Sequence, residues 1–202
     1  MVRKLIQILL VITCTGMYGC KKEDPAETAA KAFLDAMHEG NYEGMINGSD
    51  AEISQLLENT YSTDTLLENY PEEELRQKFE EYRTKAISSQ CQSYTIKSSE
   101  KDKDKNQTVF QIEVTQLDMD GMETSYTLDD YAEEHKDEFH DAEKLPEEEY
   151  QLFLMKSALD YGSALIDKAS GEKKTTTVTG TITVTGNNDG TYEVTNYSLS
   201  SD

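Results

Sequence analysis

The stretch TTTVTGTITVTGNNDGTYEVTNYSLS, residues 175–200, alternates between two kinds of side chain with a period of two. One face carries threonines, and the other carries Val178, Gly180, Ile182 and Val184. Such alternation predicts half-buried strands, and the residues GNNDG at 186–190 tolerate the positive φ values of a hairpin turn. Val194 and Tyr197 differ in parity, which predicts a β-bulge near Thr195. We therefore expect the chain to end in an antiparallel hairpin.

A second hairpin is predicted upstream. The segments SYTIKS (93–98) and TVFQIEVTQLDM (108–119) both have the two-residue period of strands. The longer one places Phe110, Ile112 and Val114 on one face and polar side chains on the other. The polar run SEKDKDKNQ (99–107) between them is expected to be an exposed connection.

The segments before these strands have helical periodicity. Asp24 and Pro25 form a helix start, with aspartate as the cap and proline at the first helical position. Apolar side chains then recur every three or four residues until Gly40, which is a typical stop. A second helical region is predicted at 42–61. These stripes are expected to face a core.

Two more helices are predicted. One opens at Pro71, and a long one opens at Pro146, at the end of an acidic stretch of low hydrophobicity (129–149). The buried side of the long helix is expected to comprise Tyr150, Phe153, Leu154, Ala158, Tyr161 and Leu165. The order of elements predicts an α+β fold with a helical insertion between two hairpins.

The opening PAETAAKAFLDAMHEGNYEGM (25–45) and the threonine-rich C-terminal hairpin resemble the cystatin-like and nuclear-transport-factor-2-like folds, in particular small Firmicute lipoproteins of unknown function. The resemblance implies a curved antiparallel sheet that wraps the N-terminal helices and leaves a cone, whose open end can hold a ligand. The candidate lining residues are Phe33, Met37, Phe110, Ile112, Val114, Tyr192 and Val194. Fold alone does not decide function.

The N-terminus has the plan of a secretory signal. Arg3 and Lys4 precede a mostly apolar run, 5–17, that is shorter than the ~20 residues of a membrane-spanning helix. The residues MYGC that follow resemble the lipobox of bacterial lipoproteins, which implies cleavage before Cys20 and its acylation. The alternative is a secreted protein cleaved elsewhere, with Cys20 as a spare thiol.

These features divide the chain into a lipoprotein signal peptide (1–19), a lipidated cysteine with a short tether (20–24) and a single α+β domain (25–202). The four residues after Cys20 span about 13–15 Å when extended, so the domain is expected to lie close to the membrane. Lys21 stands where an inner-membrane retention signal would have aspartate. We therefore expect an extracytoplasmic protein on the outer face of a Gram-positive cell membrane.

Charge and cysteine content exclude several classes of partner and linkage. The chain has 19 basic and 40 acidic side chains, and loss of Arg3 and Lys4 with the signal moves its formal net charge from −21 to −23. Nucleic acid is excluded as a partner by this charge, which favours solubility. Cleavage and acylation leave Cys91 as the single free thiol, so no intramolecular disulfide is expected.

The best match to a metal motif lies at 102–113. Asp102, Asp104, Asn106 and Glu113 occupy ligand positions of a calcium-binding EF-hand loop. Gln107 replaces the glycine that makes the sharp turn, and the flanking segments have strand character where helices are required. We therefore expect an exposed hairpin connection without saturable calcium binding below about a millimolar.

His135 and His140 are surrounded by acidic side chains, but a spacing of five residues does not place two imidazoles on one helix face. A structural or catalytic metal is not expected there, although the acidic stretch 129–149 leaves loose cation binding open. His38 is expected at a helix C-terminus, where a cation is favourable. No cofactor is predicted.

No catalytic residue is placed by the sequence. There is no nucleophile-elbow serine motif and no glycine-rich phosphate loop, and Cys91 lacks the flanking residues of an activated thiol. Three functions stay open: a lipid-anchored module that binds a small molecule or an envelope protein, an enzyme of the cone-fold kind, and an envelope accessory protein with a filled cone. We expect binding without turnover.

Overall fold

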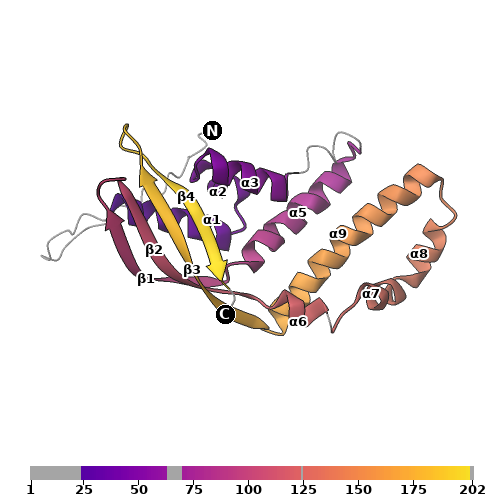
Figure 1. Cartoon of the computed structure of the whole chain (residues 1–202). Coiled ribbons are helices and arrows are strands. Elements are labelled where there is room, and N and C mark those ends of the chain that lie inside the picture. Colours follow the sequence, from indigo (N-terminus) through magenta and orange to yellow (C-terminus); the bar gives the residue numbers. More distant parts are fainter. Residues whose placement is uncertain (1–23, 63–69, 124, 201–202) are drawn as a thin grey trace, which may run out of the picture.

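The computed structural model describes residues 24–62, 70–123 and 125–200. The predicted signal peptide, Cys20 and residues 21–23 of the tether lie outside the described residues. Within them, the chain is an α+β protein with one four-stranded antiparallel sheet, as the sequence predicts. Figure 1 shows the sheet at one end of the molecule and a pair of long helices extending away from it.

The first helix, α1 (Pro25–His38), begins and ends as predicted. The Asp24 side chain accepts a hydrogen bond from the Ala26 N–H at 3.0 Å. The helix stops before Gly40, whose φ of +68° is in the region that favours glycine. The predicted cap and stop are both confirmed.

The predicted helical region 42–61 consists of two helices, α2 (Tyr42–Asn47) and α3 (Ala51–Tyr61). Asp50 separates them, because its side chain accepts a hydrogen bond from the Ile53 N–H and caps α3. The backbone of this turn also pairs with the last strand, since the Asp50 N–H donates to the Val194 carbonyl at 2.9 Å. The break in the helix therefore joins α3 to the edge of the sheet.

The sheet consists of β1 (Ser93–Asp102), β2 (Gln107–Leu117), β3 (Thr175–Gly186) and β4 (Tyr192–Ser200), in that order. Both predicted hairpins are present, and they join through antiparallel pairing of β2 with β3. On β4, Asn196 faces Thr183 and Val194 faces Val184, so Thr195 is the extra residue of the predicted bulge.

One face of the sheet is covered by α1, which packs against β3 and β4 (Figure 1). The apolar side chains predicted to share a face of each hairpin lie here, and we call this cluster the sheet core. Its largest fully buried side chains are Phe33, Leu34, Met45, Ile87, Cys91, Ile112, Val114, Ile182, Val184 and Val194. The alternation of apolar and polar side chains along the strands therefore identifies the face of the sheet that α1 covers.

The remaining helices form what we call the helical arm. It comprises α5 (Glu73–Ser89), α6 (Met119–Glu123), α7 (Leu128–Glu134), α8 (Lys136–Ala142) and α9 (Glu147–Gly171). All but α5 lie between β2 and β3 in the chain. The predicted helix starts near Pro71 and at Pro146 are confirmed. A second apolar cluster, the arm core, gathers around Met122, Tyr126, Tyr131, Leu165 and Ala169.

The helices α5 and α9 run side by side in the same direction (Figure 1). Ion pairs connect Glu74 with Lys156, Lys78 with Asp160 at 2.7 Å, and Lys85 with Asp167 at 2.8 Å. Each pair has the same separation of 82 residues along the chain, which only two parallel helices in constant register produce. Gly162 lets the Tyr82 ring approach α9, since a β-carbon there would lie 2.6 Å from the ring.

The predicted buried side of α9 is partly wrong. Ala158 is exposed, and Ser157 is buried in its place, together with Leu165, Ile166 and Ala169. The reason is that α9 contacts α5 on one side and α6 on another, and the arm core closes only around its C-terminal half. Tyr150, Phe153, Leu154 and Tyr161 are half-buried.

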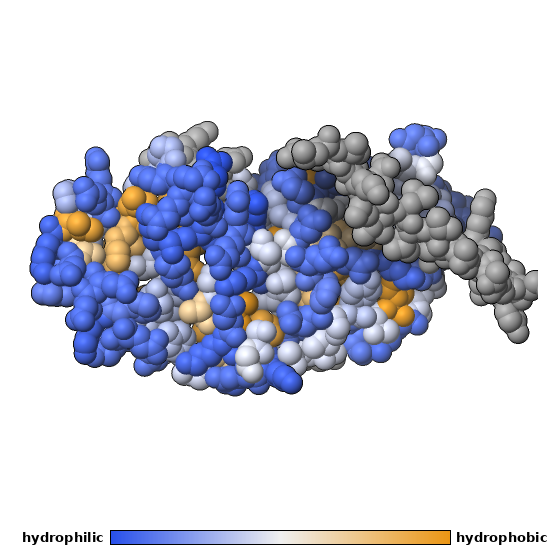
Figure 2. All heavy atoms as spheres, turned by 180° about the vertical axis from the view of Figure 1, so that it is seen from behind, coloured by the Kyte–Doolittle hydropathy of each residue, from blue (hydrophilic) through white to orange (hydrophobic). Residues whose placement is uncertain are grey.

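Figure 2 shows the molecule from behind. Hydrophilic side chains cover most of this face, and apolar side chains reach the surface in small, separate areas. Such scattered apolar groups are normal on soluble domains.

Candidate functional site

The seven candidate lining residues lie in one region but do not form one lining. Phe110, Ile112, Val114 and Val194 are closed off in the sheet core, where α1 covers them, and Tyr192 is half-buried beside it. Phe33 and Met37 of α1 also reach a hollow next to that core. Phe110, Ile112, Val114 and Val194 were expected to line a ligand cavity, but they are packed inside the sheet core and do not line the hollow.

The hollow, which we call the apolar hollow, has a volume of about 260 Å³. It lies between the N-terminal helices, the end of α5 and the edge strand β4. Its walls are Phe33, Met37, Met45, Ile53, Leu56, Leu57, Thr60, Tyr61, Gln90 and Tyr197. Leu56 is 59% exposed although it is a large apolar side chain, so it stands at the rim. The sequence did not predict α3 as a wall of this hollow, and the apolar spacing of Ile53 and Leu57 is the only local pattern that indicates it.

The polar atoms of the apolar hollow belong to uncharged groups. The Gln90 amide donates a hydrogen bond to the Tyr61 hydroxyl at 2.6 Å, and the Tyr197 hydroxyl lies 3.5 Å from the Met37 sulfur. Burial raises the pKa of both Tyr61 and Tyr197, so both phenols stay protonated at neutral pH. No carboxylate, imidazole, amine or thiol of the described residues lines this hollow.

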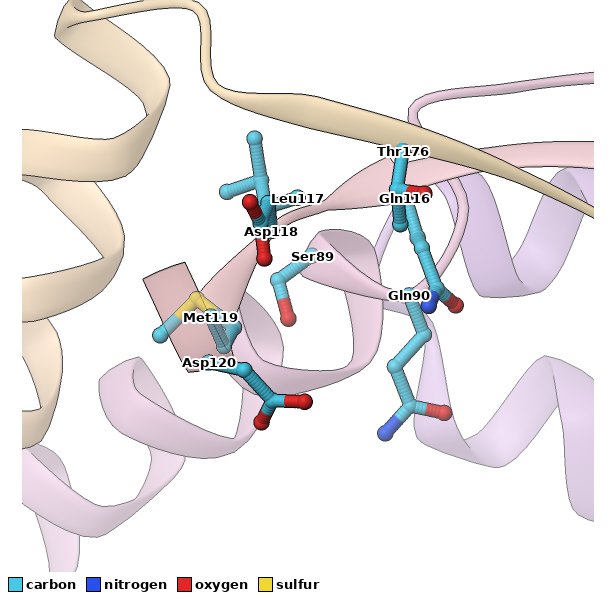
Figure 3. Close-up of a pocket in the computed structure, with 8 residues that line it drawn as sticks. All are labelled: Ser89, Gln90, Gln116, Leu117, Asp118, Met119, Asp120 and Thr176. Atoms are coloured by element: carbon cyan, nitrogen blue, oxygen red, sulfur yellow. The ribbon is translucent and has the colours of Figure 1, made fainter. Parts of the chain in front are cut away.

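A second hollow, which we call the polar hollow, lies where the sheet meets the arm and has a volume of about 160 Å³. Figure 3 shows its lining, which comes from the end of α5, the end of β2, the start of α6 and the start of β3. The residues are Ser89, Gln90, Gln116, Leu117, Asp118, Met119, Asp120 and Thr176. Gln116 pairs with Thr176 on the face of the sheet that carries Val114 and Val178. The inner face therefore changes from apolar to polar at this rung.

Hydrogen bonds fix part of the polar hollow and leave other groups open. The Gly121 N–H donates to the Asp118 carboxylate at 3.1 Å, which holds that side chain at the start of α6. The Ser89 hydroxyl donates to the Ala86 carbonyl at 2.8 Å. Among the described residues, the side chains of Gln116 and Asp120 have no hydrogen-bond or ion-pair partner. The Gln116 amide and the Asp120 carboxylate are therefore available to solvent or to a ligand in the hollow.

Cys91 and His38 have structural surroundings. The Cys91 sulfur is buried 3.9 Å from the Leu34 carbonyl, and burial raises the pKa of its thiol to about 11. A protonated thiol is a poor nucleophile at neutral pH. His38 lies at the end of α1 as predicted, with its Nδ1 atom 2.9 Å from the Cys91 carbonyl oxygen.

The two sequence motifs considered for metals lie apart from both hollows. The predicted hairpin is present, but its connection is 103–106 and not 99–107, because β1 continues to Asp102 and pairs there with Gln107. Asp102 accepts a hydrogen bond from the Asp104 N–H within the turn. His135 and His140 contact the separate carboxylates of Glu138 and Glu143. In the part of the chain that the structure describes, no group of three or more His, Cys, Asp or Glu side chains is arranged to hold a metal ion.

The fold and the site define an α+β protein in which a helix-covered antiparallel sheet carries two small adjoining hollows. No protein-family model, curated protein or solved structure matches the chain. Within 24–62, 70–123 and 125–200, no helix is both long and apolar enough to cross a membrane.

Proposed function

We propose that this protein is a lipid-anchored binding module on the outer face of a cell membrane, and that the apolar hollow is its ligand site. The anchor part of the proposal comes from the signal-like N-terminus and the residues MYGC that end at Cys20. The binding part comes from one observation: a hollow of about 260 Å³ with apolar walls and a few uncharged polar groups. Small-molecule sites have this composition.

The proposal includes a relation to the cystatin-like and nuclear-transport-factor-2-like folds. In its favour, α1 crosses one face of a four-stranded antiparallel sheet, and the hollow lies beside that helix. If the curved sheet forms such a cone, α1 fills most of it, and the apolar hollow is the open part, on the side bounded by α3.

Binding without turnover is favoured by the lining. General acid–base catalysis needs a titratable group near the substrate with a pKa close to the working pH. The titratable groups of the apolar hollow are Tyr61 and Tyr197, and burial raises the pKa of each above its ordinary value of 10. The two phenols can donate hydrogen bonds at neutral pH, but they cannot act as bases.

The binding function is tested by retention and conversion. The purified protein is incubated with cell-envelope extract, and both the retained compounds and any chemical change are followed by mass spectrometry. Thr60→Trp places a large ring at the exposed rim of the hollow, so it should abolish retention. Asn59→Trp, on the exposed face of the same helix, is the matched control and should retain ligand.

Retention without conversion supports the module. Chemical conversion of a compound by the purified protein alone would establish an enzyme. If no compound is retained and none is converted, an envelope accessory protein is favoured. The anchor is tested separately by intact-mass measurement of membrane-extracted protein. We expect Cys20 to be acylated and to be the N-terminus, and Cys20→Ala to release the protein from the membrane. An unmodified wild-type product would contradict the anchor.

A further inference from the structure

The apolar and polar hollows adjoin at Gln90, which lines both. Gln90 follows the last residue of α5, and its amide N–H₂ group donates to Tyr61 on the apolar side. Its amide oxygen has no partner among the described residues. One side chain thus forms the boundary between a hollow of apolar groups and a hollow of amides, hydroxyls and carboxylates.

We infer that the two hollows are one site for an uncharged amphiphile, with its apolar body in the apolar hollow and a hydroxyl-bearing head in the polar hollow. This inference rests on the proposed binding function and adds the chemical class of the ligand. Size supports it. At about 260 and 160 Å³, each hollow is smaller than the ~300 Å³ lower limit of typical small-molecule sites, whereas the two together exceed that limit.

The polar hollow has the hydrogen-bonding groups that hydroxyls require. A hydroxyl is both donor and acceptor, so it pairs equally with carboxylates and with side-chain amides. Asp120 offers acceptors only, Gln116 offers both, and neither has a partner among the described residues. Figure 3 shows both side chains on the wall of this hollow together with Gln90.

Charge excludes an anionic head. Asp118 and Asp120 place two carboxylates in the polar hollow, and no lysine or arginine among the described residues lines it. A phosphate, sulfate or carboxylate head would meet like charge at short range, in a protein whose overall net charge is also strongly negative. A cationic head would pair with Asp118 and Asp120, but these carboxylates are half-exposed and exposed, so such a pair contributes no more than a hydrogen bond from a hydroxyl head does.

The test uses the full chain with ¹³C-labelled methionine methyl groups and amphiphiles of equal chain length below their micelle concentrations. Met37 and Met45 report on the apolar hollow, Met119 reports on the polar hollow, and Met155 on α9 is the internal control. The probes are octyl glucoside, 1-octanol, glucose, octyl sulfate and octylammonium.

We expect octyl glucoside to shift the resonances of both hollows and 1-octanol to shift only Met37 and Met45. Octyl glucoside should bind about tenfold more tightly than 1-octanol, which is the effect of one or two added hydrogen bonds. Octyl sulfate should bind more weakly than both. Equal affinity for octyl glucoside and 1-octanol, or tighter binding of octyl sulfate or octylammonium, would overturn the inference.

A charge reversal locates the head. Asp120→Lys should weaken octyl glucoside binding severalfold and strengthen octyl sulfate binding, since it replaces an acceptor by a cation at the polar hollow. Glu80→Lys reverses an exposed charge on α5 that has no ion-pair partner among the described residues, and it should change neither affinity more than twofold. If both variants strengthen octyl sulfate binding equally, the effect is that of net charge and the head site is disproved.

The two proposals fail in different ways. If 1-octanol shifts Met37 and Met45 but a sugar head adds no affinity, the binding module stands and the amphiphile site falls. If no probe shifts these two methyl groups, while Thr60→Trp and Asn59→Trp behave alike with envelope extract, the proposed function falls as well. Glucose alone is expected to shift Met119 only weakly, because it lacks the apolar body.

Discussion

In the sheet half of the molecule, Leu34, Ile182 and Val184 are completely withdrawn from solvent, whereas Leu154 and Met155 in the outer part of the helical arm are only half-buried. The sheet core is closed by pairing of strands that are distant in sequence, with α1 laid across them. Hydrophobic burial therefore contributes most of the stability of this half.

Beyond the arm core, the outer part of the helical arm depends on other contacts. Three ion pairs join α5 to α9, and aromatic rings meet in pairs such as Phe139 with Phe153, whose centroids are 5.1 Å apart. Ion pairs at such partly exposed positions are weak and sensitive to salt. One chain therefore combines a sheet core held mainly by hydrophobic burial with an outer arm whose ion pairs weaken in salt.

The largest expected difference is in core truncation. Ile182→Ala should lower the free energy of unfolding by about 2–5 kcal/mol, because it opens a cavity in a closed core. Leu154→Ala should cost about 1 kcal/mol, since much of this side chain is already in contact with water. Urea denaturation measures both variants. Equal losses would contradict the comparison.

Two glycines at close contacts, Gly40 and Gly162, should differ in the cost of replacement by alanine. A β-carbon at Gly40 would collide with the backbone carbonyl of Thr84, and its φ of +68° adds strain, so Gly40→Ala should cost about 2 kcal/mol or more. Gly162→Ala meets only the ring of Tyr82, which can move, and alanine favours the helix, so the net cost should stay under about 1 kcal/mol. Thermal unfolding of the two variants provides the test, and the opposite order would refute the argument.

Alkaline pH should affect a tyrosine of the arm core. Burial, followed by a hydrogen bond to Glu134, raises the pKa of Tyr126 from 10.0 to about 12. The folded state therefore holds this proton more tightly than the unfolded state does, and the stability so contributed is present below pH 10 and is lost as the pH rises towards 12.

Tyr126→Phe tests this directly. At neutral pH the variant should be less stable by about 1 kcal/mol, the contribution of one hydrogen bond. The difference from wild type should narrow between pH 10 and 12, and chemical denaturation at several pH values measures it. Tyr150→Phe, half-buried on α9, is the control. A difference that stays constant up to pH 12 would disprove the assigned cause.

The smallest effect is expected from the ion pairs. A double-mutant cycle with Lys78→Met and Asp160→Asn should give a coupling of about 0.2–1 kcal/mol. The coupling should shrink at about 1 M NaCl, where charges are screened within a few ångströms. The cost of Ile182→Ala should not shrink under the same conditions. A coupling that is independent of salt would show that the pair acts through packing.

Local features of the fold were predictable because short-range physics decides them. The Asp24 cap, the stop at Gly40 and the bulge at Thr195 each depend on a few neighbouring residues. The pairing of β2 with β3 and the parallel register of α5 and α9 were not predictable, because no local pattern specifies which distant segments meet. The same limit explains why Ser157 is buried and Ala158 is not.

The site was predictable only in part. Phe33 and Met37 were named for their place on α1, but the walls from α3 and β4 follow from tertiary packing. Phe110, Ile112 and Val114 were named for a face that α1 turns out to cover completely. A usable signal was missed at Gln116 and Thr176, which are polar residues at positions where the strand alternation calls for apolar ones. Their mismatch marks the polar hollow.

The pairing of β2 with β3 has a consequence for the time course of synthesis. Strand β2 is complete at residue 117, but its partner begins at residue 175, so a ribosome adding about 5–20 residues per second needs several seconds to deliver it. During that interval Phe110, Ile112 and Val114 belong to a strand with one unpaired edge, which other nascent chains can join. Whatever keeps this edge unpaired until β3 is available, during synthesis and during export, should therefore raise the yield of correctly folded protein.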